Sequence, residues 1–136
     1  MTSVPKPSRS MAKKKKRKKL LPLGSLVKKA DRIFSSFIRE RDAVELNGKC
    51  CTCGKPGNQA GHFIKRSHKK IRWNPQNVHL QCFYCNHALG GNESEYARFI
   101  IEKYGMETFG WLLDQKGTYK PSREELNKII LAYNKS

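Results

Sequence analysis

Four of the five cysteines supply the clearest chemistry in this 136-residue sequence. They form two Cys-x-x-Cys pairs, Cys50 with Cys53 and Cys82 with Cys85, separated by 28 residues. Each pair places two thiolates on one tight turn, and two such turns can converge on a single ion. An odd cysteine count without an export signal argues against a disulfide framework. We therefore predict that these four sulfurs hold a tetrahedral structural Zn²⁺.

The fifth cysteine, Cys51, lies outside these pairs, and its simplest interpretation is a small side chain in the turn. A metal-binding pair made of Cys51 and Cys53 would have the less usual Cys-x-Cys spacing. An iron–sulfur centre also accepts four thiolates, but no other feature of the sequence indicates redox chemistry.

A second set of polar residues lies between and just after the cysteine pairs. His62 falls in the short apolar run QAGHFI, Asn77 in NVHLQ, and Asn86 directly follows the last cysteine. Two short strands that lead into a helix starting inside the second knuckle would form a ββα hairpin. A neutral imidazole can activate water near pH 7. A hard divalent ion with amide or carboxylate oxygen ligands can stabilise a leaving oxygen, so this set suits phosphodiester hydrolysis.

The order His62, Asn77, Asn86 with a Cys-x-x-Cys pair on either side resembles the HNH, or ββα-metal, nuclease motif. The segments FIRERD, AGHF, RWN, NVHLQCxxCN and GN are further similar to the phage NinG/Rap recombination endonucleases. This similarity covers roughly residues 30–133 and is most specific over 50–92.

The resemblance implies a metal-dependent DNA endonuclease that is selective for branched recombination intermediates, such as Holliday junctions or D-loops. It implies that His62 is the general base, that Asn77 orients it, and that Asn86 binds a catalytic Mg²⁺ or Mn²⁺. Symmetric cutting of a four-way junction would suit a homodimer, which is an inference from the substrate.

Two positions depart from the family pattern. Gly61 stands where many HNH enzymes carry an aspartate that binds the metal, and Asn86 stands where many carry a histidine. His79, His87, Gln59 or a backbone oxygen could supply the missing ligand. His79 should face the same side of its strand as the asparagine two residues before it, so we also assign it to the catalytic set.

The charge of the chain indicates a polyanionic partner. The sequence has 28 Lys and Arg against 11 Asp and Glu, a net charge of +17, which favours nucleic acid over an anionic membrane surface. We interpret residues 1–24 as a disordered arm that contacts phosphates without sequence preference; its first 19 residues hold nine basic side chains and no acid. The remainder still has 19 basic against 11 acidic residues, or +8.

The segment between the two expected strands is also basic. Beside a nuclease site, it would cradle the DNA backbone through Lys65, Arg66, Lys69, Lys70 and Arg72. His68 is expected to touch phosphate or solvent. Trp73 is interpreted as core or hairpin support rather than a surface on which bases stack.

Helical spacing of apolar residues predicts the elements that position these groups. A helix from Ser25, its expected N-cap, would bury one stripe and present a basic outer face. A second helix would run from Asn92, as N-cap with Glu95, to Gly105, followed by a short helix in METFGWLLDQKG. The last helix would start at a capping box formed by Ser122 with a glutamate three residues later.

We therefore predict an α+β protein with a basic arm (1–24) and one nuclease domain (25–136). The domain would have a small zinc-clamped ββα-metal (HNH, treble-clef-like) core at about 48–92, an N-terminal helix, and C-terminal helices over 93–136. No apolar run approaches the ~20 residues of a membrane span. The run LLPLGSLV is too short and interrupted for a signal peptide, so we expect a cytoplasmic, reducing location, in the host cell if the gene is carried by a phage, and no membrane partner.

Two other functions fit the same residues. One is a zinc-stabilised nucleic-acid-binding module without catalysis, which Gly61 in place of the acid favours. The other is a homing-type HNH nuclease that selects a sequence in linear duplex.

Overall fold

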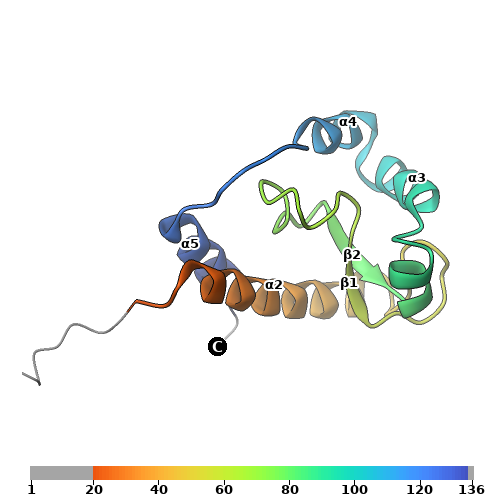
Figure 1. The fold of residues 1–136 in the computed structure, drawn as a ribbon. Helices are drawn as coiled ribbons and strands as arrows, with labels where there is room; N and C mark the ends of the chain where they lie inside the picture. The colour runs from red at the N-terminus through yellow and green to blue at the C-terminus, as the bar shows by residue number, and fades with distance from the viewer. Residues whose placement is uncertain (1–19, 135–136) are drawn as a thin grey trace, which may run out of the picture.

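The computed structural model describes residues 20–134, in which helices surround a two-stranded antiparallel sheet (Figure 1). The predicted α+β class is thereby confirmed. The first 19 residues of the predicted basic arm lie outside the described part of the chain. The elements are α2 (Leu23–Glu45), β1 (Gln59–His62), β2 (Val78–Gln81), the single π-helical turn η1 (Tyr84–Ala88), α3 (Glu93–Tyr104), α4 (Met106–Asp114) and α5 (Arg123–Tyr133).

Helix α2 forms the base of the fold, and α5 packs against it (Figure 1). The apolar residues of α2 recur every three or four positions, and five of them are buried: Leu26, Ala30, Ile33, Phe34 and Ile38. The Phe34 and Tyr133 rings meet edge to face, with centroids 4.9 Å apart. The helix begins at Leu23, two residues before the predicted cap, so Ser25 lies in the first turn and Pro22 is the N-cap.

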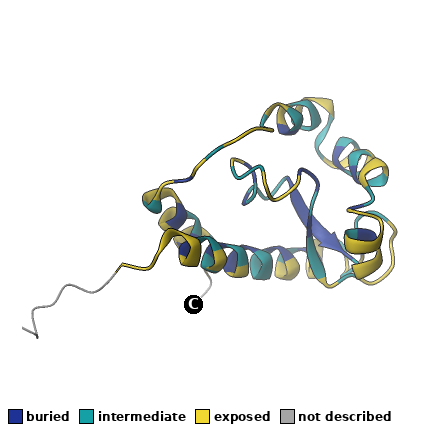
Figure 2. Cartoon of the chain, in the orientation of Figure 1, coloured by how far each residue is buried: buried dark blue, intermediate teal, exposed yellow. Residues whose placement is uncertain are grey.

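The sheet lies between two apolar clusters. All four residues of β2 are buried, and the strand appears dark blue in Figure 2. Val78 belongs to the cluster built on α2 and α5. The second cluster joins the residues after β1 to α3 and α4, through Phe63, Ile64, Ile71, Tyr96, Ile100 and Leu112. Successive strand residues face opposite sides, so adjacent positions of β2 serve different clusters.

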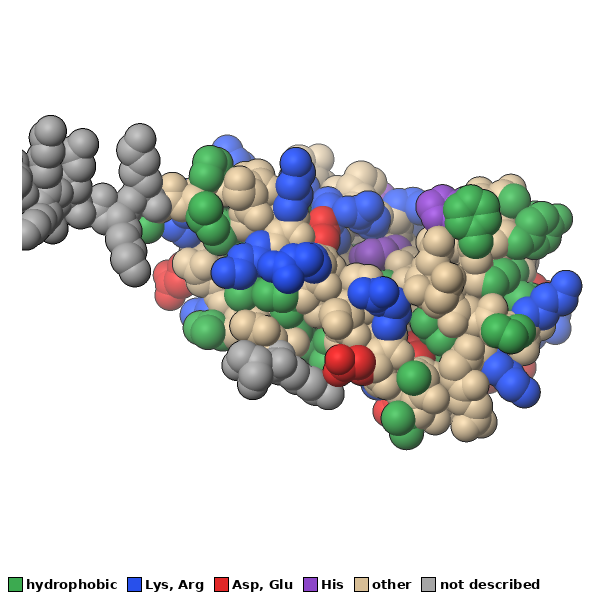
Figure 3. Space-filling view, turned by 90° about the horizontal axis from the view of Figure 1, so that it is seen from below, with side chains coloured by type: hydrophobic (Ala, Val, Ile, Leu, Met, Phe, Trp, Pro, Cys, Tyr) green, Lys and Arg blue, Asp and Glu red, His purple; other side chains and the backbone are tan. Residues whose placement is uncertain are grey.

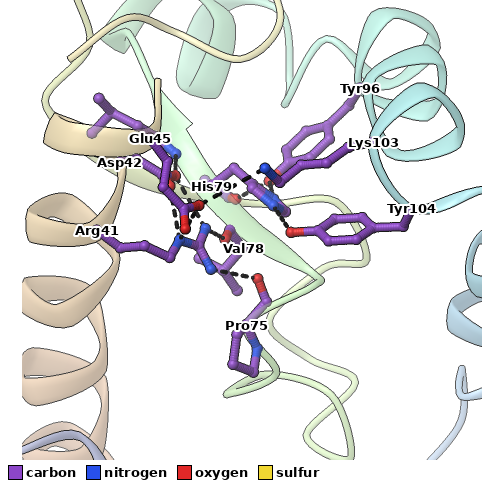
Figure 4. Close-up of polar contacts among 11 residues, drawn as sticks. Arg41, Asp42, Glu45, Pro75, Val78, His79, Tyr96, Lys103 and Tyr104 are labelled. Carbon is purple, nitrogen blue, oxygen red and sulfur yellow. Dashed lines mark hydrogen bonds and ion pairs between the residues drawn. The ribbon is translucent and has the colours of Figure 1, made fainter. Parts of the chain in front are cut away.

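A buried ion pair attaches α2 to the outer edge of β2 (Figure 4). The Asp42 carboxylate has no exposed surface and accepts the backbone N–H of Leu80 at 2.8 Å. Arg41 pairs with Asp42 and donates to the carbonyls of Pro75 and Val78, each at 2.8 Å. Arg41 is therefore a structural bridge and not part of the basic outer face that we predicted for this helix.

The C-terminal helices follow the predicted signals with one exception. Ser122 accepts the N–H of Glu125 at 3.1 Å, so the capping box is confirmed, and Gly105 ends α3 as expected. Asn92 is the N-cap of α3, but it is left-handed (φ 49°) and its side chain does not cap the helix. The helix predicted inside the second knuckle amounts only to η1. None of the helices in the described part of the chain is long and apolar enough to cross a membrane.

Candidate metal centre and candidate active site

The four predicted cysteine ligands come together at one point. The sulfurs of Cys50, Cys53, Cys82 and Cys85 all lie within 4.8 Å of one another. The Cys53 and Cys82 sulfurs are 3.7 Å apart. A tetrahedral zinc site with Zn–S bonds of ~2.3 Å requires sulfurs about 3.8 Å apart. The set therefore fits a metal ion such as zinc, as the sequence predicted.

Local backbone geometry builds this centre. Gly54, at φ +77°, donates its N–H to the Cys50 carbonyl at 2.9 Å and closes the first knuckle. In the second knuckle, the Cys85 N–H points at the Cys82 sulfur at 3.4 Å. Burial opposes ionisation of the Cys50 thiol, but hydrogen bonds from the Thr52 side chain and nearby backbone groups outweigh it and lower its pKa to about 6. A thiolate is the form that binds metal.

Cys51 lies outside the metal set, as predicted. Its side chain packs against the second apolar cluster, and burial raises its pKa.

A cleft of about 800 Å³ lies between α2, β1, the loop after β1 and η1. It brings together five of the predicted site residues: His62, Lys65, Arg66, Asn86 and His87. Helix α2 adds Arg32 and Arg39 to its lining. Figure 3 shows histidine side chains with Lys and Arg gathered around them on this side of the molecule. The cleft is therefore cationic with an imidazole at its wall.

His62 is held in one tautomer. Its Nε2 lies 2.8 Å from the backbone carbonyl of Arg72. A carbonyl can only accept, so Nε2 carries the proton and Nδ1 keeps its lone pair. Within residues 20–134 no hydrogen bond engages Nδ1. Burial lowers the pKa of His62 to about 4, and the charge of Arg66 adds to this effect, so the ring is neutral at pH 7.

The loop that presents this carbonyl is tied to α2 by Asp31. One oxygen of its carboxylate accepts hydrogen bonds from Arg72 Nε and Trp73 Nε1, both at 2.9 Å. The other oxygen accepts hydrogen bonds from Arg72 Nη2 at 2.5 Å and from Arg66 Nη2 at 2.9 Å. Burial of Asp31 raises its pKa, but the two arginines outweigh this and lower it. Sequence reasoning missed Asp31; the available signal was a single acid among the basic residues Lys28, Lys29 and Arg32 in the first half of α2.

These contacts also revise the prediction for the basic loop. The Arg72 side chain is 12% exposed and committed to Asp31, so it is not free to contact DNA. Lys69 and Lys70 line a separate hollow beside α5 and not the cleft. Lys65 donates to the Gly90 carbonyl at the rim of η1. Trp73 is buried in the first cluster, as predicted.

Asn77 does not touch the His62 ring. Its fully buried amide accepts the N–H of Ile64 at 2.7 Å and donates to the carbonyls of Ile64 at 3.0 Å and Ile71 at 3.2 Å. The prediction that Asn77 directly orients His62 is therefore wrong. Asn77 holds the shape of the loop, and the Arg72 carbonyl in that loop contacts His62.

His79 does not line the cleft. In the register of the sheet it pairs with Gly61, whereas His62 pairs with Val78, so the two histidines face opposite sides. His79 has no exposed surface and lies between the hydroxyls of Tyr104, at 2.7 Å, and Tyr96, at 3.3 Å (Figure 4). Burial lowers its pKa to about 2. The structure thus places this predicted catalytic residue in the core.

Gly61 has a structural reason for lacking a side chain. A Cβ at this position would lie 1.9 Å from Oε1 of Gln81, a fully buried residue whose Nε2 donates to the Gly91 carbonyl at 2.9 Å. An aspartate at position 61 would have to displace Gln81. Gln81 Oε1 itself has no hydrogen-bond partner among the described residues.

The predicted ligands of a catalytic ion are in the cleft, but they are few. The Asn86 amide donates to Oε1 of Gln59 at 2.8 Å, and the His87 ring lies tilted against the Phe83 ring with centroids 4.6 Å apart. Over residues 20–134, the four cysteines are the only group of three or more His, Cys, Asp or Glu that could hold a metal. An ion in the cleft would therefore depend on amide, water and phosphate oxygens.

Comparison with known proteins gives the family. The chain is 29% identical over 118 residues to Protein ninG of Escherichia phage lambda, covering 84% of this chain and 56% of that protein. It is 28% identical over 118 residues to Protein ninG of Salmonella phage P22, covering 84% and 57%. The chain thus spans just over half the length of these relatives, and no solved structure matches it. The family described as Bacteriophage Lambda NinG protein matches residues 5–136, so the chain belongs to the NinG family.

Proposed function

We propose that this protein is a metal-dependent DNA endonuclease that hydrolyses phosphodiesters in branched recombination intermediates. The observation that carries the proposal is the state of His62. Its proton is fixed on Nε2 by the Arg72 carbonyl, its free Nδ1 belongs to a ring that lines a cationic cleft, and its lowered pKa keeps it neutral. A neutral imidazole with a free lone pair is in the protonation state that can accept a proton from water at neutral pH.

In the proposed reaction, Nδ1 of His62 accepts a proton from water as the water oxygen attacks phosphorus. The bond between phosphorus and the leaving sugar oxygen then breaks. Arg32, Arg39 and Arg66 along the cleft would hold the non-bridging phosphate oxygens and so position the bond to be cut. The Nε2–H bond to the Arg72 carbonyl keeps the imidazole from turning as it takes up the proton.

The two kinds of metal have different tasks in this proposal. Zinc on the four cysteines would hold the knuckles together and take no part in the reaction. Asn86 and His87 would hold Mg²⁺ or Mn²⁺, which would supply charge stabilisation at the leaving oxygen. Mg²⁺ commonly keeps several waters and binds through one or two protein groups plus substrate phosphate, so a sparse ligand set is compatible with it.

The test is cleavage of a four-way junction and of a linear duplex of matched sequence, with and without added Mg²⁺. We expect junction cutting only with Mg²⁺ and its loss in His62→Ala. His68→Ala is the matched control, because His68 lies outside the cleft; its half-buried ring accepts the N–H of Gly117 at 2.9 Å, so thermal unfolding must show that the variant is folded. Full activity of His62→Ala would refute the assigned base, and absence of metal-dependent cutting on any DNA would refute the activity. A homodimer, if it acts on the junction, would make paired cuts.

The second candidate is a zinc-stabilised nucleic-acid-binding module without catalysis. Two observations favour it. The Gln81 side chain fills the space that an aspartate at position 61 would need, and residues 20–134 contain a single cluster of strong metal ligands. It predicts salt-sensitive binding to intact DNA. Crystals soaked in Mn²⁺ distinguish the two, because only the nuclease should show a second anomalous peak beside Asn86. A single preferred cut in linear duplex would instead indicate a homing-type nuclease.

A further inference from the structure

Two large aromatic side chains are exposed on the second zinc knuckle. Phe83 and Tyr84 are each 63% exposed, and Leu89, at the end of the same turn, is 45% exposed. Phe83 and Tyr84 occupy the two positions between Cys82 and Cys85, and the sulfurs of these cysteines lie in the metal centre. The knuckle therefore directs both rings outward, and exposing them in the monomer loses the favourable free energy of burying apolar surface.

The turn that carries these rings is firmly held. The Cys85 N–H contacts the Cys82 sulfur at 3.4 Å, and the Asn86 N–H donates to the Cys82 carbonyl at 3.0 Å. A ring presented on such a turn loses little conformational freedom when a ligand stacks on it.

One of the two exposed rings, that of Phe83, is connected to the cleft through His87. The Phe83 ring contacts the His87 imidazole, with centroids 4.6 Å apart and the ring planes tilted by 31°. His87 in turn lines the cleft together with His62. Figure 3 shows hydrophobic side chains directly beside a histidine at one border of the cationic region. An aromatic surface thus leads from the rim to the wall that holds the general base.

The chemistry of the two neighbouring surfaces indicates one occupant. The cleft attracts a negatively charged backbone through Arg32, Arg39, Lys65 and Arg66, whereas the rim offers flat apolar faces. Single-stranded nucleic acid combines both, since its bases are free to stack on aromatic side chains while its phosphates contact cations. In a perfect duplex the faces of the bases are already stacked on one another.

We propose that Phe83, Tyr84 and His87 form a stacking platform for an unpaired nucleobase next to the phosphate in the cleft. This inference rests on the proposed function for the identity of the strand in the cleft. It gives a physical basis for selecting branched DNA, because bases at a branch point can leave the helical stack at lower cost than bases within a duplex.

The test measures binding to a forked oligonucleotide with one unpaired arm and to the fully paired duplex, without added divalent ions. Fluorescence of 2-aminopurine in the unpaired arm reports stacking. We expect Phe83→Ala and Tyr84→Ala each to weaken binding of the fork about 5- to 150-fold, the range for losing one stacked base, with little change for the duplex. Phe83→Trp should restore binding. Trp111→Ala, which removes a half-exposed ring on α4, is the matched control.

The outcomes separate this inference from the nuclease proposal. Fork binding unchanged in both alanine variants, with zinc content intact, would refute the platform even if the wild type cuts DNA. Equal loss on fork and duplex would also refute it. Loss of a dimer in Phe83→Ala, with fork binding retained, would assign the rings to self-association instead. Weaker binding of the fork, with unchanged binding of the duplex, supports the platform even if the wild type never cuts DNA.

Discussion

Replacing Asp31 with asparagine tests how the fold positions the proposed base. The change keeps the size of the side chain but removes the charge that pairs with Arg72, whose side chain is only 12% exposed. Arg66, at 60% exposed, is screened by water and contributes little. Hydrogen bonds to charged groups contribute about 1.5–3 kcal/mol each. Losing part of the two Arg72 bonds should therefore lower the free energy of unfolding by about 2–4 kcal/mol.

The effect of Asp31→Asn on stability should depend on pH in a defined way. The fold lowers the pKa of Asp31, so its contribution is fully present above the unfolded-state value of about 3.9. It is lost as the pH falls further toward the folded-state value. Urea unfolding should thus separate wild type from Asp31→Asn at pH 7, and the two should converge in acid.

The same change should disturb His62, because Arg72 supplies both the side chain that Asp31 holds and the carbonyl that His62 contacts. We expect the rate of DNA cleavage per folded molecule to fall about 10–100-fold, as for other residues that orient a reacting group. Nitrogen NMR of the imidazole should show the Nε2–H tautomer in the wild type and a mixture in the variant. A variant that is less stable but keeps the wild-type rate and tautomer would refute positioning by Asp31.

Three further predictions concern His62, the metal centre and Gly61. His62→Ala should lower the cleavage rate about 10²–10⁴-fold; in the wild type, the rate should fall as the pH drops through about 4, because protonation removes the base. Cys53→Ser should release zinc and abolish the cooperative thermal unfolding transition, because metal binding is coupled to folding. Gly61→Ala should destabilise the fold by about 1–3 kcal/mol through overpacking against Gln81, and Gln81→Ala in the same chain should relieve part of that cost.

Each of these predictions has a contrary result. A pH–rate profile without an acid limb near 4, or a Cys53→Ser protein that retains full zinc content, would contradict the first two. Additive destabilisation by Gly61→Ala and Gln81→Ala in a double-mutant cycle would show that the two positions do not compete for space.

Short-range spacing made several features accessible from the sequence. The two Cys-x-x-Cys pairs predicted the metal centre, since each pair builds its turn within four residues. The capping box at Ser122 and the buried stripe of α2 were likewise local patterns, although Ser25 did not cap its helix. His62 was located correctly in a strand that faces a cleft.

Tertiary structure alone decided how the candidate site is assembled. Asp31 lies 41 residues from Arg72 in the chain, and no periodicity relates them. The register of two four-residue strands turned His79 into the core and His62 toward the cleft. The sequence by itself determined the residue types available and the turns that hold the metal ligands, because those depend on neighbours along the chain. Long-range packing of α2 against the hairpin decided which polar groups face the cleft. In such a hairpin, a shift of one residue in the strand register would turn each side chain to the opposite face of the sheet.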